Sequence, residues 1–342
     1  MFSMKKTDSV TFKIILGFVL LMAVITVGSF IAVQVILGRI GSNVSQGTAS
    51  AGETFSRHYA FIHAGGDTAL WDNIYGGALE RGRELDAYTE YFGSSLTASF
   101  DKNKLVSMAM DAGVDGIIID GDSDEETSRL IREAAGRGTP TVTILSDCAD
   151  SARICFVGFG SYTMGRQYGA EIIKHYSNSS IDVSVLMDPD SAGGGQDLII
   201  SGISDEFADK GLRDACNVKG VYVHDDTPFT AEEEIRDIFM GRNLPGAIVA
   251  LNSVYTRCLY QAAVDYNKVG DVYMYGFNDS DDILEAVDKG LLEATISVDA
   301  THMGASAVEA LDEYLNTGYV SNYITQDTEV IRAGDVIREE TE

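Results

Sequence analysis

The sequence predicts an α/β protein of two similar lobes, each built on a parallel β-sheet, preceded by one transmembrane helix. Short apolar runs alternate with segments of helical spacing, which is typical of parallel sheets with helices on both faces. The alternation restarts after ICFVGFG (154–160) and continues to residue 318. Two lobes explain 342 residues better than one very large sheet. Ahead of them lies an apolar segment without charged residues, 14–37.

The segment 14–37 is long enough to span a bilayer as a helix, which needs about 20 apolar residues. Three lysines precede it, and this favours a cytoplasmic tail at 1–13 with the remainder outside the cell. The apolar core is too long for a cleaved signal peptide. We therefore expect an uncleaved single-pass anchor in the cell membrane. A stalk rich in Ser, Gly and Thr follows at 38–56.

The first lobe is predicted from β-branched runs for strands and from 3.6-residue apolar spacing for helices. The expected strands cover 58–64, 96–100, 114–120 and 140–145. The expected helices cover 70–86, 104–113 and 123–138. The last helix has Ser123 as its expected N-cap, with Glu126 three residues on.

The second lobe repeats the pattern. Its expected strands cover 182–188, 218–224, 246–252, 271–278 and 292–298. Its expected helices cover 165–176, 198–211, 231–241, 254–267, 281–290 and 301–318.

Composition excludes several function classes. A net charge of -27 disfavours nucleic acid, because phosphate binding needs a basic face. The histidines are scattered and no C-x-x-C occurs, so no metal is expected. No Gly-x-Ser-x-Gly elbow and no Cys–His pair of known family spacing appear, so we expect neither an enzyme nor a cofactor. The four cysteines fit either buried thiols or one disulfide, for which Cys148 and Cys155 are close enough in sequence.

Two loops partly match known ligand-binding motifs, a calcium loop and a phosphate loop, but both lack essential residues of the motif. Asp120 to Glu126 begins with calcium-loop spacing, but Glu125 stands where the loop needs glycine, so helix capping explains these acids better. Ser191 to Asp197 is glycine-rich but lacks the Gly-Lys-Ser/Thr ending of a phosphate loop. We interpret it as a loop before a helix.

Ligands of open parallel sheets bind beyond the carboxyl ends of the strands. The loops expected there are polar almost throughout, although loops are polar in any case. Trp71, the only tryptophan, follows the first strand of the lobe, where a flat ring suits stacking against a sugar. A core role is the alternative. We expect Trp71→Ala to weaken ligand binding about tenfold or more without unfolding the protein.

Several phrases resemble the type I periplasmic binding proteins, in particular the ribose/galactose-type sugar-binding branch. They are VDGIIID, PTVTILSD, FVGFGSYTMGRQYGAEI, AIVALNSVYTRCLYQAA and YGFNDSDDILEAVDKGLLEATISVDATHMGASAVEAL, and the similarity spans about 58–338. The resemblance implies two Rossmann-like lobes, joined by a three-stranded hinge, that close on a ligand. The lobes are expected at 57–158 plus 299–326 and at 159–298 plus 327–338. LacI-type repressors share this fold, but here a membrane helix stands where their DNA-binding head would be.

The resemblance also implies site residues. Asn252 matches the family's asparagine, and Asn278 stands where the family has an aspartate. The sugar-gripping acid falls on Leu145, with Asp147 close behind. The full expected ligand-binding set is Thr68, Trp71, Asp147, Asp197, Asp226, Asn252, Asn278 and Val298. Asp197 and Val298 stand near the positions of a family arginine and glutamine, so the pocket is less charged than a pentose site and a simple ribose assignment is doubtful.

These features predict a solute-binding protein that closes on a small, sugar-like ligand for ABC-type uptake, with a membrane permease as its partner. The alternative is a membrane-tethered sensor that passes ligand binding to a two-component histidine kinase. The fold cannot choose between the two.

Overall fold

The structure, a computed structural model, describes residues 54–63, 68–175, 180–189, 195–224, 229–241 and 243–336. The chain divides into Met1–Glu53 and a compact unit, Thr54–Glu342, and everything below concerns the second. The predicted transmembrane helix and most of the stalk lie outside the described residues. Among the residues described, no helix has the length and apolar character needed to cross a membrane.

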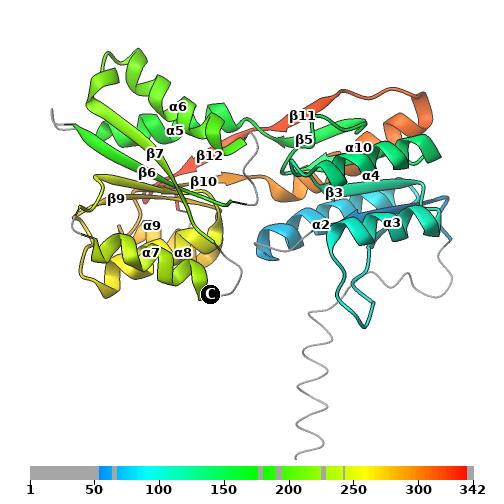
Figure 1. Cartoon of the computed structure of the whole chain (residues 1–342), viewed down its shortest axis with the longest axis horizontal. Coiled ribbons are helices and arrows are strands. Elements are labelled where there is room, and N and C mark those ends of the chain that lie inside the picture. The colour runs from blue at the N-terminus through cyan, green and yellow to red at the C-terminus, as the bar shows by residue number, and fades with distance from the viewer. Residues whose placement is uncertain are drawn as a thin grey trace, which may run out of the picture. The chain divides into compact units, whose positions relative to one another are not determined.

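The compact unit contains two six-stranded sheets (Figure 1). The first has the order β11-β5-β4-β3-β1-β2, and the second has the order β12-β10-β9-β8-β6-β7. The first sheet comprises β1 (Arg57–Ile62), β2 (Ala87–Tyr91), β3 (Gly116–Asp120), β4 (Thr141–Ile144), β5 (Cys155–Phe159) and β11 (Tyr323–Gln326). The second comprises β6 (Ile181–Met187), β7 (Cys216–Tyr222), β8 (Ala247–Ala250), β9 (Tyr273–Phe277), β10 (Ala294–Val298) and β12 (Thr328–Ile331).

Strand pairing makes the two sheets near copies of one another. All neighbours are parallel except β10 and β12. In each sheet the second strand of the lobe lies at one edge, followed by the first, third, fourth and fifth. The predicted pair of parallel-sheet α/β lobes is therefore confirmed.

Helices cover both faces of each sheet. They are α2 (Thr68–Glu84), α3 (Lys102–Ala112), α4 (Glu125–Arg137), α5 (Ser161–Lys174), α6 (Gly195–Asp209), α7 (Thr230–Met240), α8 (Ser253–Asp265), α9 (Asp281–Asp288), α10 (Ala300–Thr317) and a 3₁₀ turn at Arg213–Ala215. One continuous apolar core joins α2 and α10 on the first sheet to α5 and α6 on the second. Separate cores lie under α3 and α4 and under α7, α8 and α9.

Glycine allows two helix pairs to pack unusually closely. A Cβ at Gly304 of α10 would collide with the carbonyl oxygen of Ile74 in α2. A Cβ at Gly202 of α6 would collide with the carbonyl oxygen of Tyr162 in α5. The same arrangement occurs in both lobes: because glycine has no side chain, the backbones of the two helices can contact each other directly.

The chain passes between the two sheets three times, from β5 to α5, from β10 to α10 and from β11 to β12. Side chains hold the last crossing: Gln167 donates to the carbonyl oxygen of Thr328 (3.0 Å) and accepts from its hydroxyl (2.6 Å). Arg332 forks onto both carboxylate oxygens of the buried Glu171.

Two local predictions were wrong. The strand expected at 96–100 is loop, and the edge strand is Ala87–Tyr91, where Ala87 and Thr89 are buried whereas residues 96–100 are exposed. The N-cap of α4 is Asp124 rather than Ser123, because the Asp124 carboxylate accepts from the Glu126 amide (3.1 Å). Strands β5, β11 and β12 occur in addition to the predicted elements.

Candidate functional site

The carboxyl ends of the strands in both sheets define the candidate site, as they do for open α/β sheets in general. In the first lobe these ends lead into His63, Asp120 and Leu145. In the second they lead into Asp188, Leu251 and Asn278.

The end of β3 carries a partly buried carboxyl beside an ion pair. Lys102, on the first turn of α3, donates to the backbone oxygen of Asp120 (2.9 Å) and pairs with Asp122 (2.5 Å). Burial raises the pKa of the Asp120 carboxyl to about 7, although the Lys102 charge opposes this. A carboxyl with this pKa is partly protonated near neutrality, and so it both donates and accepts hydrogen bonds.

Groups from the two lobes approach one another at these strand ends. The Asp188 carboxylate, which follows β6, adds to the rise in the pKa of Asp120 at the end of β3. The rings of Phe159 and Phe277, at the ends of β5 and β9, lie 6.0 Å apart. The two carboxyl groups repel each other when charged, whereas the two phenyl rings attract each other. This edge therefore has both polar and apolar surface.

Asp147, predicted to bind ligand, is committed to protein contacts. Its carboxylate accepts from Thr143 Oγ1 (3.0 Å), from the Cys148 amide (2.7 Å) and from a two-pronged fork of Arg153. Leu145, two residues earlier, has a positive φ of 66°. This conformation is uncommon for a non-glycine residue and produces a sharp turn at the end of β4.

An aromatic group follows β1. Trp71 is only 3% exposed, stacks on His63 at 4.7 Å between ring centroids, and meets Phe61 edge-on. Tyr91 stacks on His63 as well and hydrogen-bonds to its ring. The structure thus places Trp71 in the core, where His63 covers one face of its ring, and Trp71→Ala must lower stability in addition to any effect on binding. The side chain of Thr68 lies outside the described part.

In the second lobe, Asn252 and Asn278 follow neighbouring strands. Asn252 is the N-cap of α8 and accepts from the Tyr255 amide (2.7 Å). Asn278 is 7% exposed, has a φ of 89°, and accepts from the Ser280 amide (2.8 Å). One acceptor of each amide is therefore used by the protein. Their contact with ligand stays a prediction.

The remaining predicted residues are spread along the same edges. Val298 is buried at the end of β10, and Asp197 is exposed on the first turn of α6. Asp226 lies outside the described residues.

Sequence reasoning missed four residues that the structure brings to these strand ends: His63, Lys102, Asp120 and Asp188. Asp120 and Asp188 belong to loops that the topology had marked, but no local signal distinguished them from other loop acids. Lys102 reaches β3 from a helix that precedes it, which spacing could not show.

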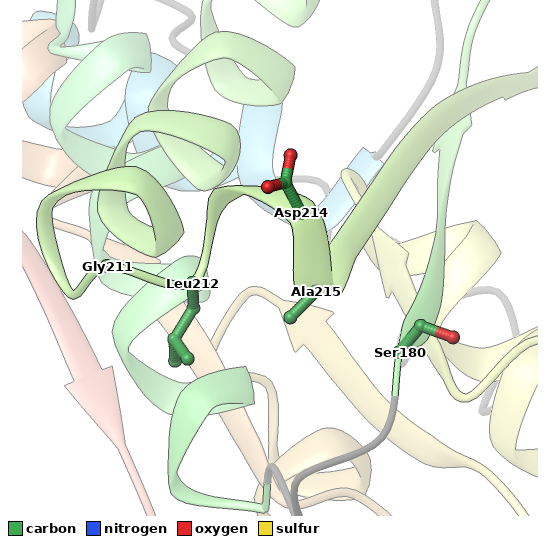
Figure 2. A pocket seen from close by; sticks show the side chains of 5 residues that line it. All are labelled: Ser180, Gly211, Leu212, Asp214 and Ala215. Carbon is green, nitrogen blue, oxygen red and sulfur yellow. The ribbon is translucent and has the colours of Figure 1, made fainter.

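A separate cavity of about 340 Å³ lies at the opposite edge of the second sheet (Figure 2). It is lined by Ser180, Gly211, Leu212, Asp214 and Ala215, next to the amino ends of β6 and β7. It is remote in topology from the strand ends described above, so we do not assign the ligand to it.

The four thiols are free, so the described structure contains no disulfide. Burial raises the pKa of Cys155 to about 11 and that of Cys216 to about 12. Cys148 and Cys155 are buried and Cys216 and Cys258 partly buried, so little of any thiol is in the reactive thiolate form near neutrality. No group of three or more His, Cys, Asp or Glu suited to a metal occurs among the described residues.

The chain belongs to the periplasmic binding protein domain family, whose sequence model matches residues 59–319. This membership confirms the predicted periplasmic binding protein fold, and the family is one of solute-binding proteins. A search of curated protein sequences gives no significant match.

Solved structures share the fold over most of the chain. The XylFII-LytSN complex contains a chain 27% identical, with a TM-score of 0.70 over 82% of this chain and 99% of that one. GanP, a glucose-galactose binding protein from Geobacillus stearothermophilus, is 22% identical, with a TM-score of 0.72 over 82% and 98%. An ABC transporter solute-binding protein from Agrobacterium vitis, bound with α-D-tagatopyranose, is 14% identical, with a TM-score of 0.71 over 83% and 97%.

Proposed function

We propose that the protein is an extracytoplasmic solute-binding protein that closes its two lobes around a small carbohydrate. The observation that carries the proposal is the approach of polar and aromatic groups at the carboxyl ends of two equivalent parallel sheets, with Asp120 and Asp188 on opposite sides. Hinge closure is the usual motion of such two-lobed proteins. Similar structures of a glucose-galactose binding protein, an arabinose binding protein and a solute-binding protein bound with tagatopyranose support a sugar as the ligand.

The groups present suit an uncharged polyol. The Asp120 carboxyl exchanges hydrogen bonds with hydroxyls in either protonation state. Asn278 and Asn252 add amide donors from the other lobe.

The binding unit lies outside the cell in this proposal, held at the membrane by a helix at 14–37. Its position suits delivery of the ligand to the permease of an ABC-type transporter.

A specific observation favours the sensor as a second candidate. Among the solved structures, the chain with 27% identity was determined in a complex with LytSN, which is a protein partner rather than a ligand alone. A permanent tether also suits a receptor that signals to one membrane partner. In this alternative the same closure on sugar is passed to a sensor kinase.

Thermal unfolding of the full-length protein with D-glucose, D-galactose, D-arabinose and D-tagatose tests sugar binding. At a sugar concentration one hundred times the Kd, the free energy of unfolding rises by about 2.7 kcal/mol. The Tm then rises by roughly 4–5 °C for a unit of this size. Asp120→Ala should abolish the rise, and the surface control Arg137→Met should keep it. The proposal fails if no sugar in an extended panel of pentoses and hexoses shifts the Tm.

Deletion of the gene separates the two candidates. Uptake predicts that cells without the protein lose transport of the radiolabelled sugar. Sensing predicts that transport capacity persists when the transporter is expressed from an independent promoter, while sugar-induced transcription is lost.

A further inference from the structure

Arg153 joins the loop after β4 to strand β11, and its side chain, 6% exposed, makes contacts in three directions. Its Nε and Nη2 donate to the two carboxylate oxygens of Asp147, the second at 2.7 Å. Its Nη1 donates to the backbone oxygen of Asn322 (2.9 Å). The guanidinium also lies 4.7 Å from the ring centroid of Tyr323. A planar, five-donor group is required to satisfy all three partners together.

One end of this link shapes the strand-end loop. Asp147, fixed by the fork, terminates a turn that contains the positive φ of Leu145 and a Ser146 amide bonded back to the Ile144 oxygen (2.7 Å). The Ser146 oxygen accepts from the Gly121 amide (3.1 Å), directly beside Asp120. Strained backbone of this kind persists only where the surroundings hold it in place.

The other end of the link is the last crossing between the lobes. Asn322 directly precedes β11, which begins at Tyr323, pairs with β5 in the first sheet and ends at Gln326. One residue later the chain enters β12 of the second sheet. A displacement of β11 is therefore transmitted directly to the other lobe.

We propose that Arg153 is a positioning residue for ligand binding, which couples the loop at 145–147 to the crossing strand β11. It acts without touching the ligand. A ligand that presses on the loop moves the Asp147 carboxylate, and the guanidinium carries this movement to Asn322 and Tyr323. The role rests on the proposed function, since it assigns a purpose to the loop at that site.

Hydrogen exchange of the full-length protein, followed by mass spectrometry, tests the coupling. In the wild type, D-glucose, D-galactose or D-arabinose should slow exchange both at 145–151 and at 321–326. Arg153→Lys keeps the charge but cannot form the fork and the backbone bond together. It should bind the sugar about tenfold more weakly and show ligand protection at 145–151 alone.

Arg137→Lys is the matched control, because Arg137 also forks between two carboxylates, Asp111 and Glu133, but on the surface. It should retain both the affinity and the protection at 321–326. A merely structural role for Arg153 would speed exchange in the free protein yet leave the two segments protected together on binding. That outcome, or unchanged affinity in Arg153→Lys, overturns the proposal.

Hydrogen exchange of the sugar-free protein tests the contacts of Arg153 without any ligand. The proposal requires Arg153→Lys to exchange faster than the wild type at both 145–151 and 321–326, and equal exchange at 321–326 overturns it. Failure of the wild type to bind any sugar instead counts against the proposed function. The two failures are therefore distinguishable.

Discussion

The Asp120 carboxyl should make the free energy of unfolding depend on pH near neutrality. Burial raises its pKa from 3.8 to about 7 on folding. The folded protein therefore binds this proton more tightly than the unfolded chain, so the contribution to stability is complete below about pH 4 and is lost as the pH rises through 7. At 1.36 kcal/mol per pH unit, about 3 kcal/mol of it would be lost between pH 5 and pH 8. Asp120 retains partial exposure, which reduces the expected loss to roughly 1.5 kcal/mol.

Urea unfolding of the full-length protein at pH 5 and pH 8, without ligand, measures this loss. Trp71 is the sole tryptophan and lies in the core of the lobe that contains Asp120, so its fluorescence reports the relevant transition. Asp120→Asn removes the titrating group. From pH 5 to pH 8, the free energy of unfolding of this variant should therefore decrease by about 1.5 kcal/mol less than that of the wild type. Glu125→Gln, which removes an exposed carboxylate on the following helix, should behave as the wild type does.

The comparison between variants isolates the group, because all other titrations are shared. If Asp120→Asn and the wild type lose the same free energy between the two pH values, Asp120 does not bind a proton near neutrality. The assignment of this carboxyl as a dual donor and acceptor for sugar hydroxyls would then lose its basis.

Three further outcomes are expected. Gly304→Val should destabilise the protein by about 1–3 kcal/mol, as urea unfolding would show, because the side chain must displace the backbone of α2 at Ile74; an unchanged midpoint would contradict the close packing. Trp71→Ala should cost about 3–5 kcal/mol of stability, whereas Trp71→Phe should cost less, and a wild-type melting curve for the Ala variant would place the ring outside the core. Thiol titration should find all four cysteines in the unreduced, denatured chain and few in the native one, and two missing thiols would reveal a disulfide.

The architecture could be predicted because buried parallel strands and amphipathic helices have different apolar periods, and both recur twice along the chain. The exceptions are the strands whose stability comes from distant partners. β2 is a five-residue edge strand with alternating burial, and β11 and β12 each have four residues, none of which is buried. Their positions depend on pairing with β1, β5 and β10, respectively, rather than on a local pattern.

The site could be predicted by position but only partly by side chain. The rule that ligands lie beyond strand ends selected loops that the structure brings together from both lobes, yet it could not show which polar groups the protein itself uses. Asp147 is occupied by Arg153, six residues further on, and Asn252 caps its own helix. By contrast, Asp120 owes its raised pKa to burial, and one of the charges that acts on it belongs to the other lobe. Such properties arise only in the folded chain.

The internal repeat adds an argument for the strand ends. Leu145 and Asn278 each follow the fourth strand of their lobe, and each has a positive φ. Asparagine tolerates this conformation, whereas leucine is strained by about 1–2 kcal/mol, which here is offset by packing against the apolar core. A turn kept at equivalent places by such different side chains is dictated by the backbone path rather than by either residue. Both turns lie at the carboxyl ends of their sheets, which is the edge where we propose that the ligand binds.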